Sequence, residues 1–181
     1  FSCSFCASDA LNKVYKENSL GKSVRQRSIE SVLNELIFCK RKYSPRSVYF
    51  TDDVFTLSVD WLRSFAPEYK SRIALPFYCT ANPGTIKDEE LYLLKSAGCQ
   101  MIGFGMQSCN EKYRNQYLKR RGANARIKEV ADLCHSLKIH FSFDHIFNLP
   151  KEKIESQFEA IRFYNETRPD IINTFTMTYL P

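Results

Sequence analysis

The chain has 181 residues, of which 44% are hydrophobic, and a formal net charge of +6. This length suits one domain with a hydrophobic core and is short for two. The 6 glycines and 7 prolines are too few for a collagen-like or low-complexity chain. No apolar run reaches the roughly 20 residues that a membrane helix needs. No signal peptide is visible in the sequence.

Helical and strand patterns alternate along the chain. Residues 7–22 are polar and predicted to be irregular, and the first amphipathic helix is predicted after Ser28, its expected N-cap. Thr85 opens a spacing typical of a capping box, Gly98 is an expected C-terminal cap, and Asn124 is a further expected N-cap. The predicted helices cover residues 29–37, 59–65, 85–98, 108–121 and 124–137, and a last one carries Ile154, Phe158 and Ile161. The predicted strands are residues 48–50, 75–80, 101–106, 139–147 and 171–179.

This alternation predicts a parallel sheet with right-handed helical crossovers. At about 35 residues for each strand and helix, the chain holds about five strands. A complete eight-stranded barrel needs about 250 residues and does not fit. An open doubly wound sheet and an incomplete six-unit barrel both fit.

Polar residues follow the apolar part of each predicted strand. In parallel α/β folds these strand ends meet at one edge of the sheet and form the active site. The strand ends read Thr51-Asp52-Asp53, Thr80-Ala81-Asn82-Pro83, Met106-Gln107-Ser108, Asp144-His145 and Thr178-Tyr179. On the fourth strand, alternation turns Asp144 inward and His145 toward the helices, where a hydrogen-bonded core histidine is expected. The strand ends therefore predict a pocket for a polar, hydroxyl-rich ligand.

The seven cysteines favour a reducing compartment, because their number is odd and five of them are isolated in apolar segments. Cys3 and Cys6 differ, since their C-x2-C spacing places two sulfurs within reach of one metal centre. A structural zinc site needs a second pair of ligands that the sequence lacks. A thioredoxin-like dithiol opens a helix directly, which the irregular segment predicted after Cys6 does not provide. An iron–sulfur cluster needs three or four thiolates, of which two are visible.

Several segments together resemble one enzyme family. FSCSFC resembles the end of the C-x3-C-x2-C cluster motif of radical S-adenosylmethionine (SAM) enzymes, and VRQRSIESVLNEL resembles the helix that follows it. TDDVFT resembles a turn common in the branch with cobalamin-binding domains, which includes magnesium-protoporphyrin monomethyl ester cyclase-like proteins. The block from Thr80 to Ser108 and FDHIFNLP at 143–150 resemble oxygen-independent coproporphyrinogen oxidases. The matches cover residues 1–150 in order.

The resemblance implies that residues 1–181 are most of a radical SAM core domain. The implied fold is a partial (βα)6 TIM-like barrel, with the first cluster cysteine and the first strand upstream of Phe1. The implied cofactors are a [4Fe–4S] cluster, whose open iron binds SAM, and SAM itself, which is cleaved to a 5′-deoxyadenosyl radical. A cobalamin domain upstream is a further implication.

The resemblance also assigns residues. The implied metal ligands are Cys3 and Cys6, with Phe5 as the aromatic residue between them. The implied SAM-binding residues are Gln107 and Asp144 for the ribose, Arg120 (or Arg121) for the carboxylate, and Asp52 and Asp53 for the amino group. Thr80 stands where coproporphyrinogen oxidase-like members have glutamate, and Asn148 replaces a glycine, so a porphyrinogen substrate is not implied.

The expected function is therefore that of a cytoplasmic radical SAM enzyme acting on a small molecule with an electron donor and without a membrane. The fragment alone is expected to be inactive. One alternative is a tRNA-modifying methylthiotransferase-like enzyme. It rests only on the basic region at residues 1–46, where nine Lys or Arg face four Asp or Glu. The other alternative is a non-catalytic α/β binding module whose cysteine pair is incidental.

Overall fold

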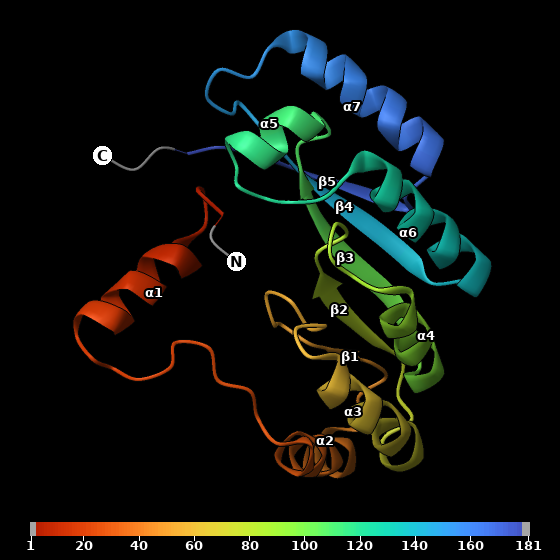
Figure 1. The fold of residues 1–181 in the computed structure, drawn as a ribbon. Helices are drawn as coiled ribbons and strands as arrows, with labels where there is room; N and C mark the ends of the chain where they lie inside the picture. Colours follow the sequence, from red (N-terminus) through yellow and green to blue (C-terminus); the bar gives the residue numbers. More distant parts are fainter. Residues whose placement is uncertain (1–2, 179–181) are drawn as a thin grey trace.

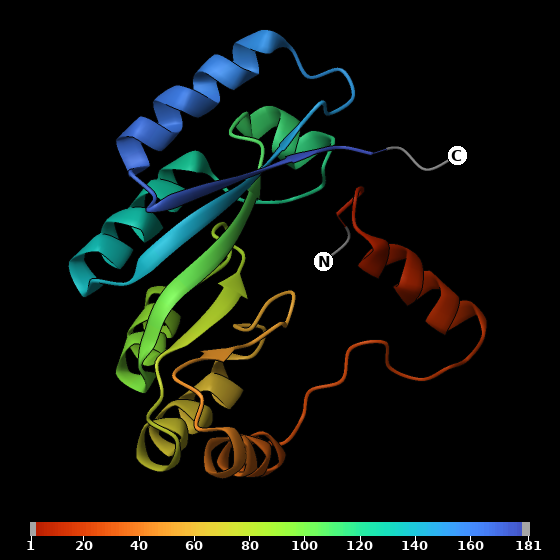
Figure 2. The same cartoon turned by 180° about the vertical axis from the view of Figure 1, so that it is seen from behind.

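The computed structural model describes residues 3–178 and contains one parallel sheet in that range. The strands are β1 (Val48–Tyr49), β2 (Phe77–Ala81), β3 (Cys99–Gln107), β4 (His140–Phe147) and β5 (Ile171–Thr176). They pair in sequential order β1-β2-β3-β4-β5, and every pairing is parallel. A doubly wound sheet reverses its strand order at a switch point. The sheet instead curls steadily in one direction into a half-barrel (Figures 1 and 2), and this confirms the predicted partial TIM-like barrel.

The helices divide into an outer layer and two elements near the carboxyl ends of the strands. The outer helices are α2 (Ile29–Tyr43), α3 (Val59–Arg72), α4 (Asp88–Ala97), α6 (Asn124–Leu137) and α7 (Ile154–Thr167). The other two are α1 (Ala7–Glu17) and the short α5 (Glu111–Gln116). Both views place α1 on the side of the sheet opposite α4, α6 and α7 (Figures 1 and 2). None of the helices between residues 3 and 178 is long and apolar enough to cross a bilayer.

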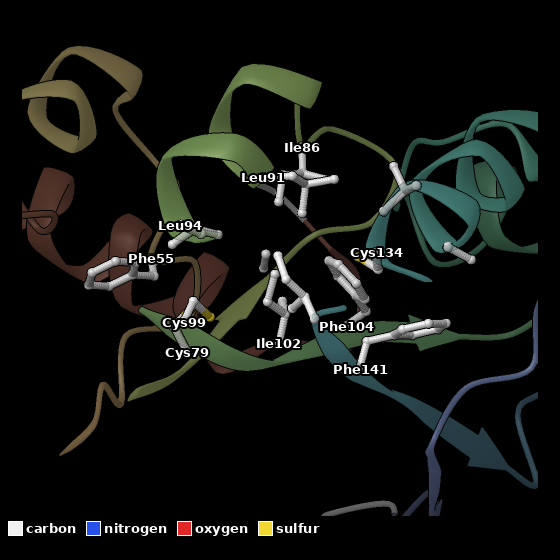
Figure 3. Packing of buried hydrophobic residues seen from close by; sticks show 14 of the residues in the cluster. Phe55, Cys79, Ile86, Leu91, Leu94, Cys99, Ile102, Phe104, Cys134 and Phe141 are labelled. Atoms are coloured by element: carbon white, nitrogen blue, oxygen red, sulfur yellow. The ribbon is translucent and has the colours of Figure 1, made fainter. Parts of the chain in front are cut away.

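The hydrophobic core lies between the convex face of the sheet and the outer helices. Figure 3 shows Leu91 and Leu94 of α4 facing Ile102 of β3, with Cys134 of α6 beside Phe104. The isolated cysteines in this core behave as small hydrophobic residues, as expected. Burial raises the pKa of the Cys134 thiol to about 12, which keeps it protonated and unreactive at neutral pH.

Some local predictions are confirmed and others are wrong. Ser28 caps α2 by accepting a hydrogen bond from the Ser31 amide at 3.3 Å, and Gly98 ends α4 in the left-handed region at φ +104°. The capping box of α4 does not begin at Thr85: Thr85 belongs to a preceding turn closed on Asn82, and the Glu90 carboxylate caps the Lys87 amide at 2.9 Å.

Two further predictions fail for reasons of context. Residues 7–22 are not irregular throughout, because α1 begins directly after Cys6; an Asp9–Lys13 ion pair at 3.4 Å supports that helix. Because a helix does follow Cys6 directly, a thioredoxin-like dithiol at Cys3 and Cys6 is no longer excluded by an irregular segment. Asn124 is the first residue of α6 and not its cap, because its side chain is hydrogen-bonded to Arg114 and to the Cys109 carbonyl.

Helix α7 buries a different face from the one its apolar residues indicate. Ile154, Phe158 and Ile161 are 65%, 56% and 56% exposed. Phe163 and Tyr164 form the buried face, and the Tyr164 ring stacks on Phe143 of β4 at 5.7 Å between centroids. Packing of the large aromatic rings against the sheet decides the orientation of this helix.

Candidate active site

The cysteine loop docks beside the end of α5. The Ser4 amide donates to the Leu118 carbonyl at 3.1 Å, and the Ser4 hydroxyl donates to the Tyr117 carbonyl at 2.7 Å. The Cys6 amide donates to the Cys3 carbonyl at 3.1 Å, so the two cysteines sit on one tight turn. These hydrogen bonds fix the loop at the carboxyl edge of the sheet, where the strand ends lie.

Phe5 anchors the same loop from its apolar side. It packs against a small buried cluster of Tyr113, Leu118 and Leu149. This cluster joins the residues around α5 to the end of β4, so Phe5 holds the cysteine loop against both. The position expected for the motif's aromatic residue is therefore a packing position.

Arg120 lies between the cysteine loop and β3. Its Nε donates to the Gly105 carbonyl at 2.7 Å, and its Nη1 lies 3.7 Å from the Cys3 Sγ. Cys3 is only 5% exposed, and its sulfur thus has a guanidinium as a neighbour. Arg121, the alternative candidate, is exposed and contributes its main chain: a Cβ on Gly84 would meet the Arg121 carbonyl at 2.5 Å. The inward arginine is Arg120.

Gln107 is turned back over β3 by an irregularity of the sheet. Gly105 pairs with Asp144 but Gln107 pairs with His145, so one residue of β3 bulges out, and Gln107 has φ +68°. A Cβ on Gly105 would lie 2.6 Å from the Gln107 Nε2 and 2.8 Å from an Arg120 nitrogen. A side chain at position 105 would therefore displace the ends of these two polar side chains.

Asp144 faces inward beside this pair, as the alternation of β4 predicts. Its carboxylate accepts a hydrogen bond from the Asn173 side chain of β5 at 2.9 Å. Asn173 was not singled out from the sequence. Its signal is that an amide at the inward position interrupts the apolar start of that strand.

The turn after β1 is tied to two neighbouring elements. The Thr80 hydroxyl donates to the Asp52 carbonyl, and the Asp53 carboxylate accepts from the Ser8 hydroxyl of α1 at 3.1 Å. Both aspartates are exposed. The Thr80 side chain therefore supports the turn by bonding the main chain of Asp52. Asp53 links the turn to the helix that follows Cys6.

Arg114 is buried and supports the residues that follow β3 at the carboxyl edge of the sheet. It is 2% exposed and donates to the carbonyls of Ser108 and Gly122 at 2.8 and 2.7 Å and to the Asn124 side chain at 2.8 Å. Burial lowers the pKa of its guanidinium. The Arg120 amide in turn donates to the Arg114 carbonyl at 3.1 Å. Sequence reasoning missed Arg114 because it lies in a short stretch that is polar throughout.

The donor set fits part of an iron–sulfur site. Within residues 3–178 no group of three or more His, Cys, Asp or Glu is arranged to hold a metal ion. Cys3 and Cys6 nevertheless present two soft sulfur donors from one turn, the donor type that such clusters prefer. The structure brings Cys3, Arg120, Gln107 and Asp144 to one end of the half-barrel, with the Asp52–Asp53 turn linked to them through α1.

A curled parallel half-barrel with a cysteine turn at its carboxyl edge defines a class of protein, and the sequence comparison agrees. Residues 1–164 match the Radical SAM superfamily, and the chain belongs to that family.

Individual relatives extend this assignment. The chain is 23% identical over 167 residues to the uncharacterized methyltransferase PH0819 of Pyrococcus horikoshii, covering 90% of this chain and 34% of that protein. Among solved structures it resembles the radical SAM methyltransferase TsrM of Kitasatospora setae, with cobalamin and a [4Fe–4S] cluster bound (TM-score 0.75, 18% identity, 86% of this chain and 32% of that one). It also resembles coproporphyrinogen III oxidase of Escherichia coli (TM-score 0.68, 17% identity, 88% and 40%). The chain spans about a third of the length of its curated relative.

Proposed function

We propose that this chain is the core of an enzyme that binds a [4Fe–4S] cluster and SAM and generates a 5′-deoxyadenosyl radical or transfers a methyl group. Family membership supports the class of cofactor. The observation that carries the proposal is the position of Arg120, which reaches the Cys3 sulfur on one side and lies beside Gln107 on the other. One cation thus adjoins both the cluster loop and the inner face of the sheet.

Each residue has a proposed role. Cys3 and Cys6 would ligate the [4Fe–4S] cluster, together with the third cysteine of the family motif. Arg120 pairs with the SAM carboxylate through its planar fork of donors. Gln107 and Asp144 bind the ribose hydroxyls. The Asp52–Asp53 turn meets the SAM amino group, and Thr80 and Phe5 position their loops.

When bound, the cluster and SAM supply the one-electron cleavage of a sulfonium that no side chain could perform. The chain's own residues orient SAM and exclude water from it. Methyl transfer as the outcome is supported by the curated relative and TsrM, both described as methyltransferases. A cobalamin domain, a small-molecule substrate, an electron donor and a cytoplasmic location belong to the same proposal.

Gly105→Ala is expected to weaken the binding of S-adenosylhomocysteine by roughly tenfold or more. The added Cβ displaces the ends of Gln107 and Arg120, and one charge-assisted hydrogen bond contributes ~1.5–3 kcal/mol. Isothermal titration of the full-length, anaerobically reconstituted protein measures the affinity. Gly98→Ala is the matched control: it strains the end of α4 at φ +104°, and its Cβ meets only the Leu75 carbonyl at 3.7 Å. Equal affinities for the wild type and Gly105→Ala would contradict the assigned roles.

The two alternatives make different predictions. A tRNA-modifying enzyme is expected to co-purify with RNA, and the bound RNA should be lost when salt is raised. A non-catalytic module is expected to take up no cluster on reconstitution. Family membership favours an enzyme over the second alternative.

A further inference from the structure

A chain of hydrogen bonds on the outer side of the sheet joins the ends of β3 and β4. The Ser108 hydroxyl donates to the Glu152 Oε1 at 2.7 Å, and the Gln157 Nε2 donates to the Glu152 Oε2 at 3.0 Å. The Gln157 Oε1 lies 3.1 Å from the His145 Nε2. Glu152 precedes α7 and Gln157 lies within it, so two segments far from β3 in sequence connect Ser108 to His145.

The hydrogen bonds converge on the Glu152 carboxylate, which accepts from Ser108 on one side and from Gln157 on the other. Because the Gln157 amide nitrogen donates to Glu152, its oxygen is left to accept from the His145 Nε2–H. The His145 Nδ1 then accepts from the Tyr164 hydroxyl, 2.8 Å away. Burial lowers the pKa of His145, which keeps the ring neutral in this single tautomer. Burial raises the pKa of Glu152, and the hydrogen bonds from Ser108 and Gln157 oppose that rise.

The two strand residues that this hydrogen-bond network connects lie next to the candidate SAM-binding residues. Ser108 directly follows Gln107, and His145 directly follows Asp144; both are buried, at 0% and 1% exposure. Gln107 and His145 are also the paired residues at the irregularity between β3 and β4. Helix α7 already packs on the sheet through its aromatic residues, and its polar contacts fall at the two residues next to the inward-facing pair.

We infer that Glu152 is a positioning residue, which through Ser108 and through Gln157 and His145 sets the relative placement of Gln107 and Asp144 on the opposite face of the sheet. This inference rests on the proposed function, since it assumes that those two side chains bind the ribose of SAM. Within residues 3–178, the hydrogen-bond partners of the Glu152 carboxylate are Ser108 and Gln157, and neither of them is a SAM-binding candidate.

A double-mutant cycle in the full-length reconstituted protein separates positioning from mere stability. Glu152→Ala is expected to weaken S-adenosylhomocysteine binding about tenfold in the wild-type background and about threefold when Gln107 is already alanine, because only the route through Gln157 and His145 to Asp144 then remains. A purely structural loss would weaken both backgrounds equally. Glu155→Ala is the control, because it removes an exposed carboxylate from the first turn of the same helix. Ser108→Ala replaces Glu152→Ala if the latter does not fold.

The outcomes distinguish failure of the positioning role of Glu152 from failure of the proposed SAM site. Suppose that the wild type binds S-adenosylhomocysteine and that Gln107→Ala weakens this binding. If Glu152→Ala then has no effect, or the same effect in both backgrounds, the positioning role is wrong and the proposed function stands. If the wild type does not bind S-adenosylhomocysteine, or Gln107→Ala binds as well as wild type, the ribose site itself is wrong and the inference is overturned with it.

Discussion

Cys3→Ala and Cys6→Ala are each expected to lower the protein's affinity for its iron–sulfur cluster by more than about 100-fold. Outer-shell partners of a metal already contribute 10–100-fold, and these residues are proposed as direct ligands. Iron and acid-labile sulfide per protein, with the brown absorbance, measure the loss after anaerobic reconstitution. Both sulfurs lie on one tight turn, so the remaining cysteine cannot replace the lost one.

Cys39→Ala is the matched control for this prediction. Cys39 is a half-buried thiol on α2, so its removal changes the cysteine count without touching the proposed turn. Equal loss of iron in the Cys39 variant would point to general destabilisation. Full iron content in both the Cys3 and Cys6 variants would contradict the assignment of the turn as the cluster loop.

Arg120→Gln is expected to weaken SAM binding by about 10–100-fold, because an ion pair with hydrogen bonds to a carboxylate contributes ~1.5–3 kcal/mol. Cluster content should fall much less, since Arg120 only neighbours the Cys3 sulfur at 3.7 Å. Arg120→Lys should restore affinity only in part, because lysine keeps the charge and loses the planar fork. Equilibrium binding of SAM and iron analysis measure the two effects separately.

The control for Arg120 is its neighbour. Arg121→Gln removes the same charge from an exposed position whose main-chain carbonyl lies against Gly84. We expect it to bind SAM like the wild type. If Arg121→Gln loses affinity and Arg120→Gln does not, the roles of the two arginines are reversed.

The sequence predicted the fold well because a strong periodic signal repeats in it. Each strand is an apolar segment that ends in polar residues, and each is separated from the next by a helical pattern. The inward position of Asp144 and the buried, hydrogen-bonded state of His145 both follow from alternation along β4, and the structure confirms both. The sequence could not order the strands by periodicity alone, so the doubly wound alternative stayed open.

The predictions that failed depend on tertiary contacts. Asn124 is an ideal cap by residue type, yet the buried guanidinium of Arg114 captures its side chain. The exposed face of α7 carries more aliphatic residues than the buried one, but Tyr164 fits against Phe143 and orients the helix. The contact of Arg120 with Cys3 spans 117 positions of the sequence and has no local signal.

The site was only partly foreseeable for the same reason. Strand-end positions singled out Gln107 and Asp144, and the C-x2-C spacing singled out the cysteines, while their proposed roles come from the resemblance to the family. Glu152 and Arg114 support those residues from outside the motifs, through contacts that only the folded chain creates. The residues proposed to touch the cofactors are thus easier to predict here than the residues that support them.

In the proposed function, SAM binds the cluster that the cysteine turn holds. Electron paramagnetic resonance of the reduced, full-length reconstituted protein tests it most directly, in the presence and absence of SAM. We expect a reduced-cluster signal whose g values shift when SAM is added, with a much smaller shift in Arg120→Gln at the same concentration. A cluster signal that SAM leaves unchanged, or reconstituted protein without any cluster, would contradict it.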